Sequence, residues 1–214
     1  MASQLLALHD RLLAHFGPQG WWPGETPFEV MVGAVLTQNT SWANVSRAIA
    51  ALRDHDLLSL PALAAMPVAE LAGWIRPAGY FNQKALRLKG LIAAINQEYG
   101  GDLAALFATG TPELRAWLLA RKGIGPETAD SILLYAAGKP VFVVDAYTHR
   151  ILSRHRLTPE ESSYHELQEL FMDGLPEDVA LFNEFHALLV ACGKDFCRKS
   201  RPRCDGCPLQ GWPE

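Results

Sequence analysis

Apolar residues recur along this chain at intervals of three and four positions, the spacing that gathers them on one face of an α-helix. The pattern is clearest in three groups, which are Trp42, Val45, Ile49 and Leu52, then Leu88, Leu91, Ile92, Ile95 and Tyr99, and finally Leu167, Leu170 and Phe171. Residues 28–36, FEVMVGAVL, are apolar almost all round and predict a central buried helix. We therefore expect an all-α protein of about ten helices.

Proline and glycine mark the ends of the predicted helices. In TPELRAWLLAR, Thr111 stands where an N-cap belongs and Pro112 where the first helical residue belongs. A later helix is expected to begin at Pro126 and to end at Gly138. Only residues 141–144, VFVV, have the composition of a strand, and a lone strand has no partner with which to pair.

The composition is that of a globular protein, because 49% of the 214 residues are hydrophobic and 20% are charged. Such a chain is long enough to divide into two lobes. No apolar run is long enough for a membrane span, and the start, MASQLLALHD, lacks the features of a signal peptide. We therefore expect a cytoplasmic protein without a membrane partner.

The net charge of −4 gives no general attraction for a polyanion, so a nucleic-acid partner would require a local basic cluster. One such cluster is KDFCRKSRPR, residues 194–203, in which Asp195 is the sole acidic residue. A solvated charged tail is the alternative interpretation of this segment.

All the cysteines, Cys192, Cys197, Cys204 and Cys207, fall within the last 23 residues. Their number also allows two disulfides. A cytosolic setting and the close spacing of Cys204 and Cys207 favour a metal site.

Two glycines, Gly123 and Gly125, precede the helix that begins at Pro126. A dinucleotide-binding turn would need a strand before the glycines and a third glycine or alanine, whereas a helix is expected here and Thr128 holds the third place. A helical hairpin remains, whose uncovered backbone N–H groups suit phosphate oxygens. An ordinary helical turn with glycine at its end is the alternative.

Four motifs occur in order along the chain: AVLTQNTSW at 34–42, GYFNQKA at 79–85, KGIGPETAD at 122–130 and VVDAYTHR at 143–150. Together with the cysteine cluster, they resemble the helix-hairpin-helix DNA glycosylases of the endonuclease III superfamily over most of the chain. The resemblance implies a two-lobed helical fold with a cysteine-cluster loop at 192–207. Residues 1–25 and 140–214 would form one lobe, and residues 26–139 the lobe that carries the hairpin, 112–138.

The resemblance implies that the protein flips a damaged nucleotide out of double-stranded DNA and cuts its N-glycosidic bond. Asp145 matches the family's catalytic aspartate, whose carboxylate stabilises the cationic sugar and orients water; by itself it also suits the N-cap of a helix. Glu127 stands where bifunctional members have the lysine that forms a Schiff base. A monofunctional enzyme is therefore implied, although Lys122 lies close enough in sequence to give weak lyase activity.

The resemblance also assigns DNA contacts. Gln38 matches the residue that fills the space left by the extruded base, and Tyr80 the wedge against the opposite strand. A helix-end cap and a packed loop aromatic are the respective alternatives. The residues expected to bind the DNA backbone are Lys122, Gly123, Ile124, Gly125, Arg198, Lys199, Arg201 and Arg203.

Trp21, Trp22 and Trp42 make the chain similar to the 3-methyladenine DNA glycosylase branch, in which aromatic side chains stack on the flipped base. An alkylated purine is cationic, so aromatic faces attract it. The alternative role of these tryptophans is to fill the core.

Family members with an iron-sulfur cluster use the spacing Cys-x6-Cys-x2-Cys-x5-Cys. Cys197, Cys204 and Cys207 match its first three places, but Pro213 occupies the fourth. Cys192 is expected to supply the fourth thiolate. A structural [4Fe-4S] cluster is implied, with zinc as the alternative.

The expected function is therefore that of a monomeric, nucleoid-associated, monofunctional base excision repair glycosylase for alkylated purines such as 3-methyladenine. Two alternatives stay open. One is an endonuclease III-like glycosylase for oxidised pyrimidines with weak AP lyase activity, and the other is a noncatalytic module that binds damaged DNA.

Overall fold

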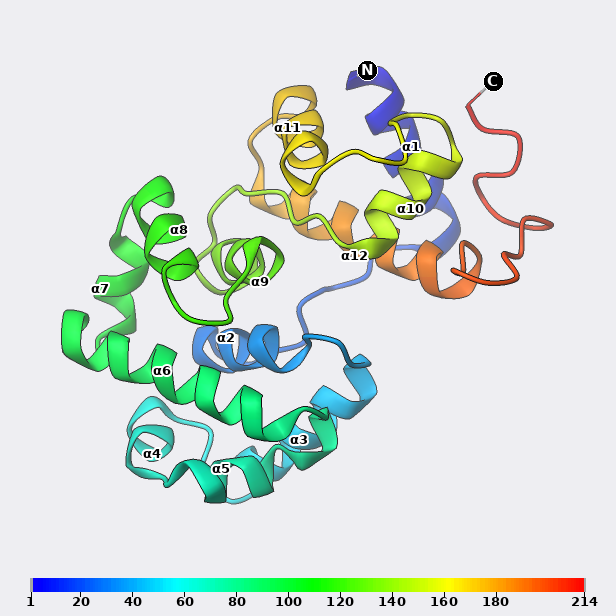
Figure 1. The fold of residues 1–214 in the computed structure, drawn as a ribbon. Helices are drawn as coiled ribbons and strands as arrows, with labels where there is room; N and C mark the ends of the chain where they lie inside the picture. The colour runs from blue at the N-terminus through cyan, green and yellow to red at the C-terminus, as the bar shows by residue number, and fades with distance from the viewer. Residues whose placement is uncertain (1, 214) are drawn as a thin grey trace. The chain divides into compact units, whose positions relative to one another are not determined.

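The computed structural model describes residues 2–213, and within that range the chain has twelve α-helices and no strand (Figure 1). The predicted all-α fold class is thus confirmed. The number exceeds the expected ten because the short helices α4, α5 and α7, each of six or seven residues, carry too little sequence to show periodicity. No helix among the described residues has the length and apolarity needed to cross a membrane.

The chain divides into two compact units. Unit 1 comprises the residues up to Trp22 and those from Pro140 onward. Its helices are α1 (Ala2–Phe16), α10 (Ala146–Arg154), α11 (Tyr164–Gly174) and α12 (Val179–Asp195).

An aromatic cluster forms the centre of unit 1. Phe142 and Phe171 stack with ring centroids 3.8 Å apart and planes 4° apart, and the rings of Phe182 and Phe185 meet Phe142 edge-on. All four side chains are fully buried. One face of α1, carrying Leu5, packs in the same unit against α12. Offset and edge-on ring contacts add to the stabilisation that burial provides.

Residues 141–144, which have the composition of a strand, are extended and buried but belong to no sheet. Side chains of α11 and the residues at its start take the place of a partner strand. Gln168 Nε2 donates to the Phe142 carbonyl at 2.8 Å, and the Phe142 N–H reaches Met172 Sδ at 3.3 Å. The Val144 N–H lies 3.5 Å from the Tyr164 hydroxyl oxygen. Buried backbone groups require such partners, and here they fix the segment that leads to Asp145.

Unit 2 comprises Pro23–Lys139. Its elements are α2 (Pro27–Leu36), α3 (Trp42–Arg53), α4 (Leu60–Ala65), α5 (Val68–Trp74), the 3-10 turn η1 (Arg76–Ala78), α6 (Phe81–Tyr99), α7 (Leu103–Ala108), α8 (Thr111–Leu119), α9 (Pro126–Ser131) and the π-helical turn η2 (Ile132–Ala136).

The helix α2 lies at the centre of unit 2, as its apolar sequence predicts. Every residue from Phe28 to Leu36 is buried, and α2 packs against α3, α6, α9 and η2 (Figure 1). Helix α6 in turn contacts α4 and α5 as well as α2. It also contacts α7 and η1, so α6 packs against elements on several sides of the unit.

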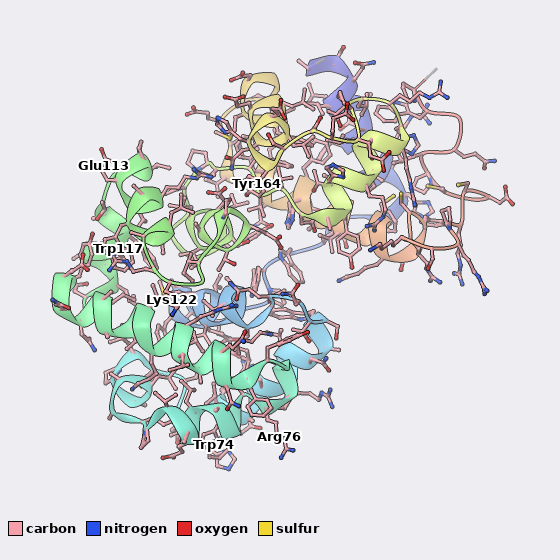
Figure 2. The ribbon with its side chains drawn as sticks, viewed as in Figure 1. Trp74, Arg76, Glu113, Trp117, Lys122 and Tyr164 are labelled. Carbon is pink, nitrogen blue, oxygen red and sulfur yellow. The ribbon has the colours of Figure 1, made fainter. Side chains whose placement is uncertain are left out.

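The helices α8 and α9 form the predicted hairpin, but the predicted N-cap at Thr111 is wrong. The N-cap residue of α8 is Gly110, and Thr111 is already helical. The carboxylate of Glu113, labelled at the start of α8 in Figure 2, folds back over Gly110. A carboxylate stabilises the positive end of a helix, so the threonine side chain is not needed there.

The second helix of the hairpin begins at Pro126, as predicted, and its last turn widens into η2. Gly138, with φ of 62°, follows the end of the helical stretch. The π-helical turn has no counterpart in the sequence analysis, because the period of the apolar residues does not distinguish it from an α-helix.

Candidate active site and nucleic-acid interface

Asp145 is the N-cap of α10 in unit 1. Its Oδ1 accepts hydrogen bonds from the Tyr147 N–H at 2.9 Å, the Thr148 N–H at 2.7 Å and the Thr148 hydroxyl at 3.0 Å. The capping role considered from sequence is therefore confirmed. These bonds occupy one carboxylate oxygen and leave Oδ2 pointing away from the cap.

The Oδ2 atom of Asp145 lies 3.6 Å from Nε2 of His186 on α12, an ion-pair distance. Both side chains are nearly buried, with 11% and 9% exposure respectively. Burial by itself would raise the pKa of Asp145, but His186 and the hydrogen bonds from Thr148 outweigh burial and hold that pKa below its ordinary value. The site therefore presents an ionised carboxylate in a mostly dry environment.

The close packing of α10 on α12 brings His186 to Asp145. Gly193 permits this approach, because a Cβ at that position would collide with the ring of Tyr147. His186 stands inside the largely apolar run FNEFHALLV, and nothing in that pattern marks it as a partner of Asp145. A lone histidine on a buried helical face was the available signal, but only the fold pairs it with Asp145.

The tryptophans assigned to the base pocket are all half-buried. Trp21 and Trp22 in unit 1 have ring centroids 5.0 Å apart and planes inclined by 54°. Trp42 is the first residue of α3 in unit 2. Trp21 and Trp22 are neighbours along the chain, so their ring contact does not depend on how the helices pack.

Gln38 follows α2 and is bound to the hairpin rather than capping a helix. Its Nε2 donates to the Gly123 carbonyl and to the Thr128 hydroxyl, both at 2.9 Å. Its Oε1 accepts from the guanidinium of Arg87 on α6. Arg87 was not selected from the sequence, because these contacts join residues that are far apart along the chain.

Tyr80 is exposed over 67% of its surface and has φ of 46° at the N-cap of α6. It is therefore not the packed loop aromatic of the alternative interpretation. An exposed aromatic ring on a fixed helix end is suited to contact another molecule.

The hairpin turn exposes Lys122, Gly123 and Gly125, while Ile124 is buried and anchors the turn (Figure 2 labels Lys122). Gly123 has φ of 83°, which favours glycine. Gly125 has φ of −94°, and a Cβ there would meet nothing within 4 Å. Neither backbone strain nor internal packing requires a glycine at 125, so its bare backbone is open to a ligand. Glu127 is exposed one turn further on.

The cysteines differ in burial and none is in a disulfide. Cys192 and Cys197 are buried, Cys207 is half-buried and Cys204 is exposed. Burial, together with the neighbouring Cys207 and Cys197 thiols, raises the pKa of Cys192. Within residues 2–213, no group of three or more histidine, cysteine or acidic side chains is arranged as a metal cage.

Two arginines of α10 secure the segment that follows α12. Arg150 Nε donates to the Cys197 carbonyl at 2.6 Å. Arg154 donates to the carbonyls of Arg198 at 2.7 Å and Lys199 at 3.0 Å, and contacts Cys197 Sγ at 3.5 Å. The basic side chains expected to bind DNA, Arg198, Lys199, Arg201 and Arg203, are all exposed.

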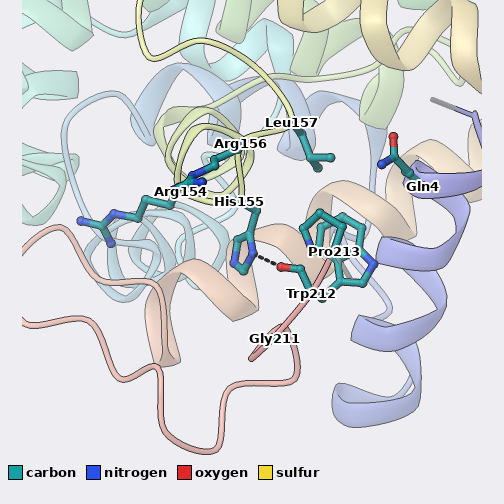
Figure 3. A pocket seen from close by; sticks show the side chains of 8 residues that line it. All are labelled: Gln4, Arg154, His155, Arg156, Leu157, Gly211, Trp212 and Pro213. Atoms are coloured by element: carbon teal, nitrogen blue, oxygen red, sulfur yellow. Dashed lines mark hydrogen bonds between the residues drawn. The ribbon is translucent and has the colours of Figure 1, made fainter.

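A pocket of about 430 Å³ lies in unit 1 between the end of α10 and the C-terminal segment (Figure 3). Its lining includes Arg156 and Trp212, and Nδ1 of His155 lies 2.6 Å from the Trp212 carbonyl oxygen. Asp145 does not line this pocket.

The sequence is similar to those of known DNA repair proteins. Residues 32–177 match the family model described as HhH-GPD superfamily base excision DNA repair protein. A Methanocaldococcus jannaschii protein, named as a candidate DNA repair glycosylase, is 48% identical over 97% of this chain and 94% of its own length.

Two solved structures share the fold. H. pylori 3-methyladenine DNA glycosylase (MagIII), bound to 1,N6-ethenoadenine, has a TM-score of 0.79 and 33% identity, covering 90% of this chain and 96% of its own. A trapped endonuclease III–DNA covalent intermediate has a TM-score of 0.82 and 23% identity, covering 98% and 93%. Since the family model spans most of the chain, this protein belongs to the HhH-GPD superfamily of base excision DNA repair proteins.

Proposed function

We propose that the protein is a monofunctional DNA glycosylase that hydrolyses the N-glycosidic bond of alkylated purines, such as 3-methyladenine, in double-stranded DNA. The observation that carries the proposal is the ionised, nearly buried carboxylate of Asp145, with one oxygen fixed by the helix cap and the other beside His186. The half-buried pair Trp21 and Trp22 supports a cationic base as the substrate. The similarity to a protein named 3-methyladenine DNA glycosylase points the same way.

In the proposed reaction, the C1′–N bond of the flipped nucleotide breaks and both bonding electrons leave with the base. Asp145 stabilises the positive charge that develops on the sugar. Water then adds to C1′, and its proton passes through the Asp145 carboxylate to solvent. A purine alkylated at a ring nitrogen, as in 3-methyladenine, already carries a positive charge, so it leaves as a neutral base without a protonating acid.

The absence of an amine at position 127 supports simple hydrolysis. Glu127 cannot form the Schiff base through which bifunctional glycosylases break the strand. Borohydride treatment of the reaction should therefore trap no strong covalent protein–DNA band. A strong band that disappears in Lys122→Ala would show instead that Lys122 acts as a lyase.

The DNA contacts follow from the exposed groups. The exposed turn residues Lys122, Gly123 and Gly125 would hold phosphates through backbone N–H groups, while the N–H of the buried Ile124 donates to the Arg121 carbonyl at 3.1 Å and keeps the turn closed. The basic segment 198–203 would add charge contacts. Gln38 would fill the space left by the flipped nucleotide, Tyr80 would form the wedge against the opposite strand, and the protein would act on chromosomal DNA as a monomer.

We also propose that Cys192, Cys197, Cys204 and Cys207 hold a [4Fe-4S] cluster, with zinc as the alternative. Four thiols suit either group, and three of them are close enough that their charges interact. The group would order the basic segment and takes no part in the proposed hydrolysis. Broad visible absorbance and about four irons per chain would support the cluster. Zinc without iron after anaerobic purification would show that the cysteines bind zinc instead.

A panel of duplexes tests the substrate. Release of free base, with an intact abasic strand, is expected from DNA carrying 3-methyladenine. Release from oxidised pyrimidines alone would support the endonuclease III-like alternative. Tight binding of damaged DNA without release of any base would support a noncatalytic binding module.

A further inference from the structure

Lys84 and Arg87 lie one turn apart on α6. They connect the segments of unit 2 that contact DNA in the proposed function. Lys84 is 1% exposed, and its Nζ donates to the carbonyls of Leu36 and Ala78, both at 2.8 Å. Leu36 ends α2 two residues before Gln38, and Ala78 ends η1 two residues before Tyr80. One buried ammonium group thus fixes the backbone next to both candidate wedge residues.

Arg87 extends this connection to the hairpin turn. Its guanidinium donates to Gln38 Oε1, while Gln38 Nε2 donates to the Gly123 carbonyl. The Arg87 side chain also lies against the turn itself, because a Cβ at position 123 would collide with it. The wedge candidate, the turn that would hold phosphate and α6 therefore form one hydrogen-bonded group.

We propose that Lys84 and Arg87 are positioning residues that hold Gln38 and Tyr80 in a fixed relation to the hairpin turn before DNA binds. The inference rests on the DNA contacts assigned under the proposed function. Opening a duplex is favoured when the groups that fill the gap are already in place, because their ordering then costs nothing at the moment of opening. A buried lysine is seldom retained for stability alone, since an apolar side chain often serves as well.

Lys89 provides a matched control on the same helix. Its Nζ donates to the carbonyls of Leu63, Ala64 and Met66 at 2.5 to 2.9 Å. The chemistry is that of Lys84, but the acceptors lie at the end of α4, to which no DNA contact is assigned. A general loss of stability from removing a lysine of α6 should therefore appear equally in Lys89→Met.

The experiment uses a duplex with a tetrahydrofuran abasic analogue opposite 2-aminopurine, which requires no knowledge of the preferred lesion. Fluorescence at saturating protein reports insertion of the wedge, and anisotropy reports binding. Gln38→Ala and Tyr80→Ala set the signal expected without a wedge. We expect Lys84→Met and Arg87→Met to lower the insertion equilibrium about tenfold, the effect of one charge-assisted hydrogen bond. Arg87→Lys should restore part of the signal, and Lys89→Met should match the wild type.

The outcomes separate the two proposals. If Gln38→Ala and Tyr80→Ala keep the wild-type signal, the wedge assignments fall and the positioning roles fall with them. If those variants lose the signal while Lys84→Met and Arg87→Met keep it, the positioning inference alone is overturned. An equal loss in Lys89→Met also overturns it. If Lys84→Met does not fold, the variants of the half-buried Arg87 decide the question. The insertion signal should then fall in Arg87→Met and recover in part in Arg87→Lys.

Discussion

At the scale of single residues, the candidate site depends on side chains with more than one partner. Asp145 caps α10 with one oxygen and faces His186 with the other. The capping role could be predicted from the sequence because it involves neighbours along the chain. The contacts of Asp145 with His186 and of Gln38 with Arg87 and Gly123 could not, since they depend on how helices pack.

Lys84 gives a prediction about pH. Burial, and secondarily the charge of Arg87, lowers the pKa of Lys84 from 10.5 to about 8. Between these values the unfolded chain holds more protons than the folded one, so the contribution of Lys84 to stability rises with pH. The free energy of unfolding of the wild type, relative to Lys84→Met, should increase from pH 8 to pH 10 in urea titrations. A difference that stays flat or decreases over this range would contradict the lowered pKa.

At the scale of elements, the hairpin shows what local pattern predicts. Pro126 and Gly138 correctly marked the limits of its second helical stretch. The choice of Thr111 as N-cap failed because Glu113 turns back over Gly110, which is a side-chain conformation that the sequence does not specify. Residues 141–144 were strand-like in composition but are secured by side chains of a distant helix, so no sheet was needed.

The two hairpin helices are joined by a buried ion pair. Arg115 on α8 donates to Asp130 on α9 through Nε at 2.6 Å and Nη2 at 3.0 Å, and Asp130 is fully buried. Arg115→Met breaks the pair, so it should lower the free energy of unfolding by about 3 kcal/mol. Glu169→Gln removes the exposed pair with His165 on α11 and should cost about 1 kcal/mol or less. Equal losses in denaturant unfolding would show that the buried pair has no special role.

For the molecule as a whole, composition predicted a globular chain and the spacing of apolar residues predicted helices, but neither located the proposed DNA contacts. The net charge of −4 is unfavourable for a polyanion, so the proposed binding must come from exposed local groups. The segment 198–203 supplies such groups, with Arg150 and Arg154 of α10 holding its beginning in place.

This local origin of binding can be measured through its salt dependence. The double variant Arg201→Ser, Arg203→Ser should reduce the slope of log K against log salt concentration by about 0.9 for each phosphate that the protein no longer neutralises. The corresponding double change to lysine keeps the charges and should keep the slope. An unchanged slope in the serine variant would place the segment outside the DNA interface.

Single-turnover release of free base shows whether the Asp145 carboxylate carries out base excision. Asn caps helices about as well as Asp, so Asp145→Asn should fold and bind damaged duplex like the wild type while excision slows about 10²- to 10³-fold. Asp178, an exposed N-cap residue of α12 that accepts from the Leu181 N–H, provides the control, and Asp178→Asn should excise at the wild-type rate. Wild-type excision by Asp145→Asn, or an equal loss in Asp178→Asn, would contradict the account.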